Sequence, residues 1–113
     1  MHELSITRNV VSIVSEHAQG QKVLRVTLEV GRLSGMFSEA IRFCFDICAK
    51  GTALEGATLR IVDVEGRGLC SACGAEPVMT MPLGRCPACL EPSLRIVAGT
   101  ELKIKEMEVE SCV

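Results

Sequence analysis

Aromatic side chains are scarce in this 113-residue chain, which contains three Phe and neither Trp nor Tyr. The hydrophobic core must therefore be built mainly from Val, Ile, Leu, Ala and Met. No apolar run approaches the ~20 residues that a helix needs to cross a bilayer, so no membrane span is expected. The length suits one compact domain, with a small metal-stabilised module at most.

The chain also lacks a strong charge of either sign, since its formal net charge is −2. Neither a nucleic acid nor an acidic membrane is therefore expected as a partner. The start, Met1-His2-Glu3-Leu4, has no basic segment before an apolar stretch, which differs from a signal peptide and predicts a cytoplasmic location. No Ser–His–Asp arrangement, paired-carboxylate motif or open metal site is visible, so we expect a protein that is not an enzyme.

Hydrophobic periodicity predicts two helices and a strand in the first half of the chain. Apolar residues recur at helical spacing over residues 4–18, and they alternate with polar residues over 23–30, as in a strand with one buried face. A second helix is expected from Ser38, as its N-cap, to about residue 49.

Two further strands are expected in the second half, over residues 58–64 and 101–109. In the last segment Leu102 and Ile104 share one phase of the alternation, whereas Met107 and Val109 have the other. A β-bulge near Lys105–Glu106 would bring both pairs to the same face.

The composition changes between residues 66 and 97, a stretch that holds all four Pro and both Cys-x-x-Cys pairs. We expect an α+β fold in which two helices cover one face of a small three-stranded sheet, with an inserted zinc-ribbon module. Residues 1–65 plus 98–113 would then form the α+β domain, and residues 66–97 would form the zinc-ribbon domain.

Four of the seven cysteines form two pairs with metal-ligand spacing, Cys70-x-x-Cys73 and Cys86-x-x-Cys89. Zn²⁺ prefers a tetrahedral shell of thiolates, and each two-residue spacer brings two sulfurs to one point. Twelve residues separate the pairs and allow a hairpin to bring them together. With four protein ligands no position is left for a reactive water, so this zinc site is expected to be structural.

Other functions of the two pairs remain open at this stage. A redox dithiol requires only one such pair, and an iron–sulfur cluster is a further alternative. A zinc ribbon can also act as an adaptor that binds protein or nucleic acid. Residues 66–97 carry three Arg against two Glu and no aromatic residue to stack on a base, which disfavours nucleic acid.

The remaining cysteines are not expected to bind metal. Cys44 and Cys48 lie four residues apart on the second predicted helix and are interpreted as small hydrophobic core residues. Cys112, near the C-terminus, is expected to be exposed.

His2 offers a second type of metal site. If Met1 keeps a free amine, the amine, the deprotonated backbone amide of His2 and the imidazole form fused chelate rings in one plane. Ni²⁺ and Cu²⁺ favour such tetragonal nitrogen sites, and Glu3 can supply a further ligand. The spacing by itself is weak support, because a histidine at position 2 is usually an ordinary exposed residue.

The chain as a whole resembles the HypA/HybF family of nickel metallochaperones for [NiFe]-hydrogenase maturation. The resemblance rests on the start Met1–Ser5, the segment Glu29–Gly35, the two Cys-x-x-Cys pairs and the segment Glu101–Glu106, in that order. It implies a nickel site centred on His2, with Glu3 and the Met1 amine, and structural Zn²⁺ on the four cysteines.

The same resemblance implies that Ni²⁺ is a cargo delivered to the hydrogenase large-subunit precursor. A nickel-handling maturation GTPase is an implied partner, and urease maturation proteins are further candidates. The sequence departs from the family at Leu90, where a glycine is usual after the second cysteine pair, so a less tightly closed second turn is expected.

Overall fold

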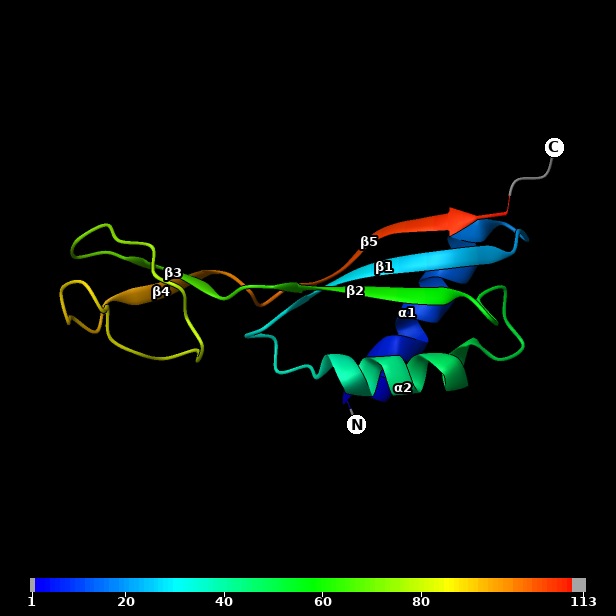
Figure 1. Ribbon diagram of the computed structural model, residues 1–113, viewed down its shortest axis with the longest axis horizontal. Helices are drawn as coiled ribbons and strands as arrows, with labels where there is room; N and C mark the ends of the chain where they lie inside the picture. Colours follow the sequence, from blue (N-terminus) through cyan, green and yellow to red (C-terminus); the bar gives the residue numbers. More distant parts are fainter. Residues whose placement is uncertain (1, 111–113) are drawn as a thin grey trace.

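The computed structural model describes residues 2–110, and the side chains from Glu3 onward. The molecule is elongated, with extents of 57 × 31 × 17 Å. Figure 1 shows a body of helices and sheet at one end, and a small ribbon at the other.

The sheet of the body has three strands in the order β2-β1-β5. The central strand β1 (Val23–Gly31) pairs in parallel with β2 (Thr58–Val64) and antiparallel with β5 (Leu102–Val109). These bounds agree with the three strands that the alternation predicts to within one residue at each end.

The predicted bulge in β5 is confirmed by the strand register. Thr27 of β1 pairs with Glu106, while the next residue, Leu28, pairs with Ile104. Lys105 is therefore the extra residue, and the bulge places Ile104 and Met107 against the same core.

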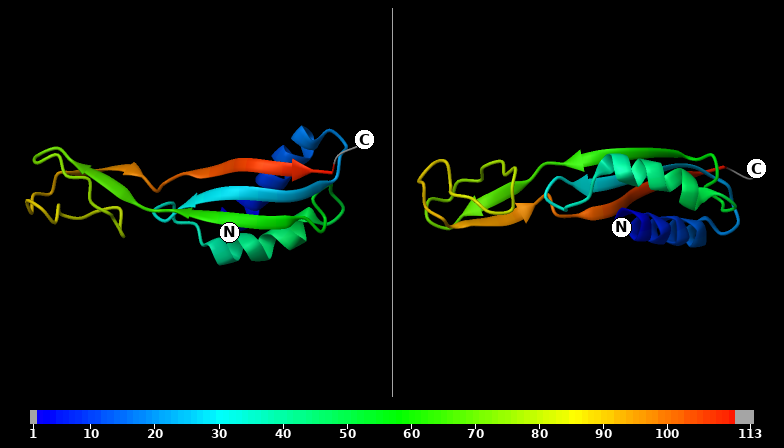
Figure 2. Two further views of the ribbon diagram at one scale, coloured as in Figure 1. Left: turned by 45° about the horizontal axis from the view of Figure 1, so that its top comes forward. Right: turned by 90° about the horizontal axis from the view of Figure 1, so that it is seen from below.

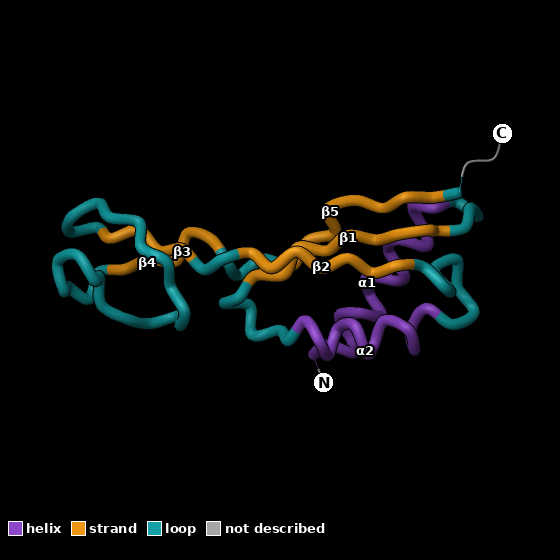
Figure 3. Tube along the Cα trace, viewed as in Figure 1, coloured by secondary structure: helices purple, strands orange, loops and turns teal. Residues whose placement is uncertain are grey.

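Both helices lie on one face of this sheet (Figure 2). Helix α1 (His2–Ala18) begins two residues before the predicted start, and α2 (Ser38–Ala49) ends where predicted but already includes Ser38, the predicted N-cap. Figure 3 shows α1 behind the sheet and α2 along its lower edge. The buried core between the helices and the sheet consists of Val10, Val11, Val14, Ala18, Val23, Val26, Leu28, Val30, Ile41, Phe45, Ala49 and Leu54.

The prediction that Ser38 caps α2 is wrong. The N-cap is Phe37, which makes no side-chain capping hydrogen bond. The Ser38 hydroxyl instead donates to the carboxylate of Asp63 on β2, at 2.9 Å. The Ser38 hydroxyl therefore bonds a distant residue, Asp63, and not a backbone group of the first helical turn.

The inserted segment forms a separate antiparallel pair, β3 (Arg67–Cys70) with β4 (Leu94–Ala98). The four cysteines lie at the far end of this pair, so the fold is the expected α+β arrangement with an inserted zinc-ribbon module. Within residues 2–110, neither helix has the length and apolar character that crossing a bilayer requires.

Between the body and the ribbon, the loop after β1 packs closely against the two chain segments that join the ribbon to the body. We call this place the crossing, and Gly31, Gly66 and Gly99 make it possible. The N–H of Leu33 donates to the carbonyl of Gly99 at 2.7 Å. A Cβ atom on Gly31 would lie 2.1 Å from that same carbonyl oxygen, and one on Gly66 would lie 2.4 Å from the carbonyl oxygen of Met79. The chain segments that enter and leave the ribbon therefore press directly against the loop after β1.

Candidate metal centre

Two similar turns present the four cysteines at the end of the ribbon. In the first turn the N–H of Gly74 donates to the carbonyl of Cys70 at 2.9 Å, and in the second the N–H of Leu90 donates to that of Cys86 at 2.7 Å. In each turn, the fourth residue after the first cysteine is thus hydrogen-bonded back to that cysteine's carbonyl. The second turn closes like the first although Leu90 replaces a glycine.

Leu90 adopts the same left-handed backbone as the glycine that it matches. Its φ is 65°, and that of Gly74 is 79°. A left-handed conformation costs a side-chain-bearing residue about 1–2 kcal/mol, whereas glycine adopts it freely. The leucine therefore leaves the geometry of the turn intact and adds strain to it.

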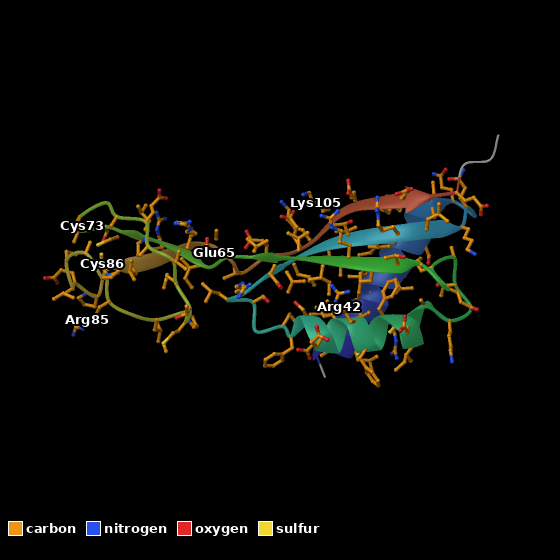
Figure 4. The ribbon with its side chains drawn as sticks, in the orientation of Figure 1. Arg42, Glu65, Cys73, Arg85, Cys86 and Lys105 are labelled. Atoms are coloured by element: carbon orange, nitrogen blue, oxygen red, sulfur yellow. The ribbon has the colours of Figure 1, made fainter. Side chains whose placement is uncertain are left out.

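The two turns bring all four sulfurs together, within 4.8 Å of one another. The Cys70 and Cys89 sulfurs are 3.6 Å apart, and those of Cys73 and Cys86 are 3.7 Å apart. Tetrahedral zinc with sulfurs at ~2.3 Å separates those sulfurs by about 3.8 Å. The observed spacing and the all-thiol donor set thus fit a zinc ion with four protein ligands. Figure 4 shows Cys73 and Cys86 at the tip of the ribbon.

The thiols are electrostatically unequal. Hydrogen bonds from the Ser93 hydroxyl and the backbone N–H of Cys73 lower the pKa of Cys70 from 9.0 to about 6. A backbone hydrogen bond at Glu91 favours the Cys89 thiolate, yet desolvation and the neighbouring thiols outweigh it and raise its pKa to about 12. Four thiolates cannot share so small a volume without a cation, and a divalent metal ion would supply the compensating charge.

Ser93 is a site residue that no pattern in the sequence indicates. Its hydroxyl lies 3.3 Å from the Cys70 sulfur, and its carbonyl accepts the N–H of Ser71. Serine is common in loops, and only the return of β4 alongside β3 brings residue 93 to the first cysteine.

The predicted nickel ligands lie at the start of α1. Met1 and the side chain of His2 are outside the described part of the structure, but the backbone of His2 is the first residue of the helix. The Glu3 carboxylate accepts a hydrogen bond from the backbone N–H of Phe37, at 3.2 Å. The N-terminal ends of both helices therefore meet at Glu3.

An open groove of about 830 Å³ lies next to this meeting point. Its lining includes Met36 and Phe37, the carboxylate residues Asp63 and Glu65 at the end of β2, and Met79 of the ribbon. Phe37, which is 73% exposed, thus contacts Glu3 through its backbone and faces both solvent and the groove.

The other cysteines are not gathered with these sites. Cys44 and Cys48 are half-buried on α2, and Cys48 packs against the hydrophobic core as expected. Cys112 lies outside the described residues.

Comparison of the sequence with known families gives one match along nearly the whole chain. The family described as "Hydrogenase/urease nickel incorporation, metallochaperone, hypA" matches residues 1–109. A hydrogenase maturation factor HypA from Rippkaea orientalis is 55% identical over 114 residues and covers 100% of both chains. The factor of the same name from Geobacter metallireducens is 51% identical and covers 97% of this chain and 100% of its own.

Two solved structures have the same fold. The solution structure of the Ni metallochaperone HypA from Helicobacter pylori matches with a TM-score of 0.67 and 23% identity, covering 95% of this chain and 96% of its own. A second solution structure, of a HypA protein, matches with a TM-score of 0.71 and 25% identity over 97% of each chain.

Proposed function

The chain belongs to the HypA family of metallochaperones for hydrogenase and urease nickel incorporation, and we propose that it binds Ni²⁺ at its N-terminus for delivery to a [NiFe]-hydrogenase large-subunit precursor. The proposed ligands are the Met1 amine, the backbone amide and imidazole of His2, and Glu3. The observation that carries this proposal is the start of α1 at His2.

The first N–H groups of a helix have no intrahelical acceptor. The amide of His2 can therefore lose its proton and bind nickel without breaking a helical hydrogen bond. The positive end of the helix dipole also favours the resulting negative charge. Planar nitrogen coordination at this position is thus compatible with an intact α1.

Glu3 links the proposed nickel site to α2. Its carboxylate is shared with the N–H of Phe37, so an occupied nickel site competes with that hydrogen bond. A planar complex at a chain end leaves its axial directions open to ligands from a receiving protein. Ligand exchange, rather than catalysis, is the proposed mechanism, and the protein is proposed not to be an enzyme.

We assign zinc to Cys70, Cys73, Cys86 and Cys89 as a structural ion that holds residues 66–97 together as a unit. Residues 1–65 plus 98–113 are proposed as the nickel-binding domain. The thiolate spacing supports the first assignment, and the position of His2 supports the second.

The proposed partners are a nickel-handling maturation GTPase and the hydrogenase large-subunit precursor, with urease maturation proteins as further candidates. The proposed location is the cytoplasm. The alternative function, a zinc-ribbon adaptor that binds protein or nucleic acid without nickel, predicts that Ni²⁺ binding is independent of His2.

Calorimetric titration of Ni²⁺ into the zinc-loaded protein distinguishes these functions. The chain has two histidines, so His17→Ala is a matched control for His2→Ala. His17 is exposed at the other end of α1, with its Nδ1 2.9 Å from the Ile13 carbonyl oxygen.

We expect one tight equivalent of Ni²⁺ in the wild type and in His17→Ala, and loss of that tight binding in His2→Ala. Equal binding by all three proteins would contradict the N-terminal site and favour the adaptor. Nickel transfer from the loaded protein to a purified large-subunit precursor then tests the delivery step.

A further inference from the structure

The four cysteines of the metal centre differ in their exposure to solvent. Cys70 and Cys86, the first cysteine of each turn, are 1% and 0% exposed. Cys89 is half-buried, whereas Cys73 is exposed. Residues 71–74 are exposed throughout, so Cys73 lies on an open turn at the tip of the ribbon (Figure 4). Solvent therefore reaches the centre most directly at Cys73.

Hydrogen bonding also separates the two cysteines of the first turn. The Cys70 sulfur lies 3.3 Å from the Ser93 hydroxyl oxygen, and it accepts the backbone N–H of Cys73 as well. The Cys73 sulfur accepts a backbone hydrogen bond from Ala75. Each donated hydrogen bond withdraws negative charge from a thiolate and weakens it as a nucleophile. Cys70, which is both buried and bonded to Ser93, is therefore the less reactive of the two.

We propose that Cys73 is a modification site for peroxides, at which oxidation forms a disulfide with Cys86 and releases the zinc ion. The proposal rests on the zinc assignment made above. All four ligands of a bound zinc ion are thiolates, so exposure decides which sulfur an oxidant reaches first. The Cys86 sulfur is 3.7 Å from that of Cys73. A disulfide places its sulfurs about 2 Å apart, so a small movement of the two turns joins them.

The reaction consumes one hydrogen peroxide for each disulfide. The Cys73 thiolate attacks a peroxide oxygen, the O–O bond breaks, and the sulfur becomes a sulfenic acid as hydroxide leaves. The Cys86 thiolate then attacks the Cys73 sulfur, the S–S bond forms, the S–O bond breaks, and a second hydroxide leaves. The two thiolates lose two electrons and the peroxide gains them. Two protons from solvent convert both hydroxides to water.

This disulfide would dismantle the metal centre. Cys70 and Cys89 then remain as thiolates, and two ligands do not complete the tetrahedral shell that zinc requires, so the ion leaves as Zn²⁺. The new bond joins the two turns, whereas a redox dithiol would join the two members of one Cys-x-x-Cys pair. Mapping the disulfide therefore separates the two reactions.

The body of the protein does not depend on this centre for its core. The buried cluster and the residues packed against it lie within residues 6–61 and 102–109. Both helices belong to that part of the chain. Loss of zinc should therefore loosen residues 66–97 and leave the helices in place. Peroxide would thus disable the ribbon without unfolding the body.

Zinc release from the zinc-loaded, full-length protein tests the proposal. The protein is treated with hydrogen peroxide in the presence of a chromogenic zinc chelator, and the chelator alone gives the spontaneous rate. Dimedone traps sulfenic acid, and peptide mass spectrometry identifies the labelled cysteine and the disulfide. The triple variant Cys44→Ala, Cys48→Ala, Cys112→Ser removes the three cysteines outside the centre and is a matched control. Zinc content is measured before oxidation.

We expect zinc release at least about tenfold faster with peroxide than with the chelator alone, in the wild type and in the triple variant. Dimedone should label Cys73 before the other three ligands, and the disulfide should join Cys73 to Cys86. The helical signal in circular dichroism should persist. Dithiothreitol followed by Zn²⁺ should restore the original zinc content.

Three results would overturn the proposal while leaving the zinc assignment intact. These are zinc that stays bound while peroxide oxidises the other cysteines, a first label on a ligand other than Cys73, and a disulfide within one Cys-x-x-Cys pair. Loss of the helical signal would contradict a change confined to the ribbon. A protein that holds no zinc before oxidation would instead overturn the zinc assignment, and this proposal with it.

Discussion

The carboxylate of Glu3, at the start of α1, accepts a hydrogen bond from the backbone N–H of Phe37, at the start of α2, across 3.2 Å. These residues are 34 positions apart in the sequence. The contact places the positive ends of two helix dipoles at one carboxylate. Glu3 thus has a structural role that is separable from its proposed role as a nickel ligand.

Two substitutions at Glu3 separate these roles. Glu3→Gln keeps an oxygen that can accept from Phe37 but removes the anionic ligand, so we expect at least about tenfold weaker Ni²⁺ binding with little change in melting temperature. Glu3→Ala should lower both. Calorimetry with Ni²⁺ and thermal unfolding measure the two effects, and unchanged nickel affinity in Glu3→Gln would remove Glu3 from the ligand set.

Leu90 is expected to strain the second cysteine turn. It is 68% exposed, so its side chain gains little from burial while its backbone is held at positive φ. Leu90→Gly should stabilise the zinc-loaded protein by about 1 kcal/mol. Gly74→Leu, the reciprocal change in the first turn, should destabilise it by a similar amount. Chemical unfolding measures both changes. A loss of stability in Leu90→Gly would show that contacts of the leucine side chain stabilise the protein by more than the backbone strain costs.

Gly31 is expected to be intolerant of any side chain. Its missing Cβ would lie 2.1 Å from the carbonyl oxygen of Gly99, which is backbone and cannot rotate away. Gly31→Ala should therefore cost at least about 2 kcal/mol of unfolding free energy. Gly84→Ala is the control, because a Cβ there meets open space, and it should stay within about 0.5 kcal/mol of the wild type. Equal stability of the two variants would show that the crossing can open.

The sequence pattern predicted those features of the fold that depend on residues close together in the chain. The change of apolar phase across Lys105 predicted the bulge, because buried faces must stay in register. The spacing of the cysteines predicted the sulfur cluster for a similar reason, since each two-residue turn fixes its own pair.

The prediction that was wrong and the contacts that were missed all depend on residues far apart in the sequence. Ser38 has the composition of a helix cap, but Asp63, 25 residues later, takes its hydroxyl. Ser93 reaches the Cys70 sulfur across the β3–β4 pair, and the contact of Gly31 with Gly99 joins segments 68 residues apart. None of these partners is marked by a period or a spacing, so only the assembled fold reveals them.

The carboxylate of Glu101 should make the crossing between body and ribbon sensitive to acid. The backbone N–H groups of Glu101 itself and of Gly99, together with Lys103, hold its pKa below the ordinary value of 4.5. A lowered pKa in the folded state adds stability that is complete above pH 4.5 and is lost as the pH falls through the folded value. Glu101→Gln removes this contribution at every pH.

Denaturant unfolding of the wild type and of Glu101→Gln, at matched zinc content between pH 7 and pH 3, checks this expectation. The wild type should be the more stable protein at pH 7, by an amount that is constant down to about pH 4.5 and then shrinks. Both proteins carry the same cysteine cluster, so its response to pH cancels in the difference. A stability difference that is independent of pH would show that the Glu101 charge does not stabilise the crossing.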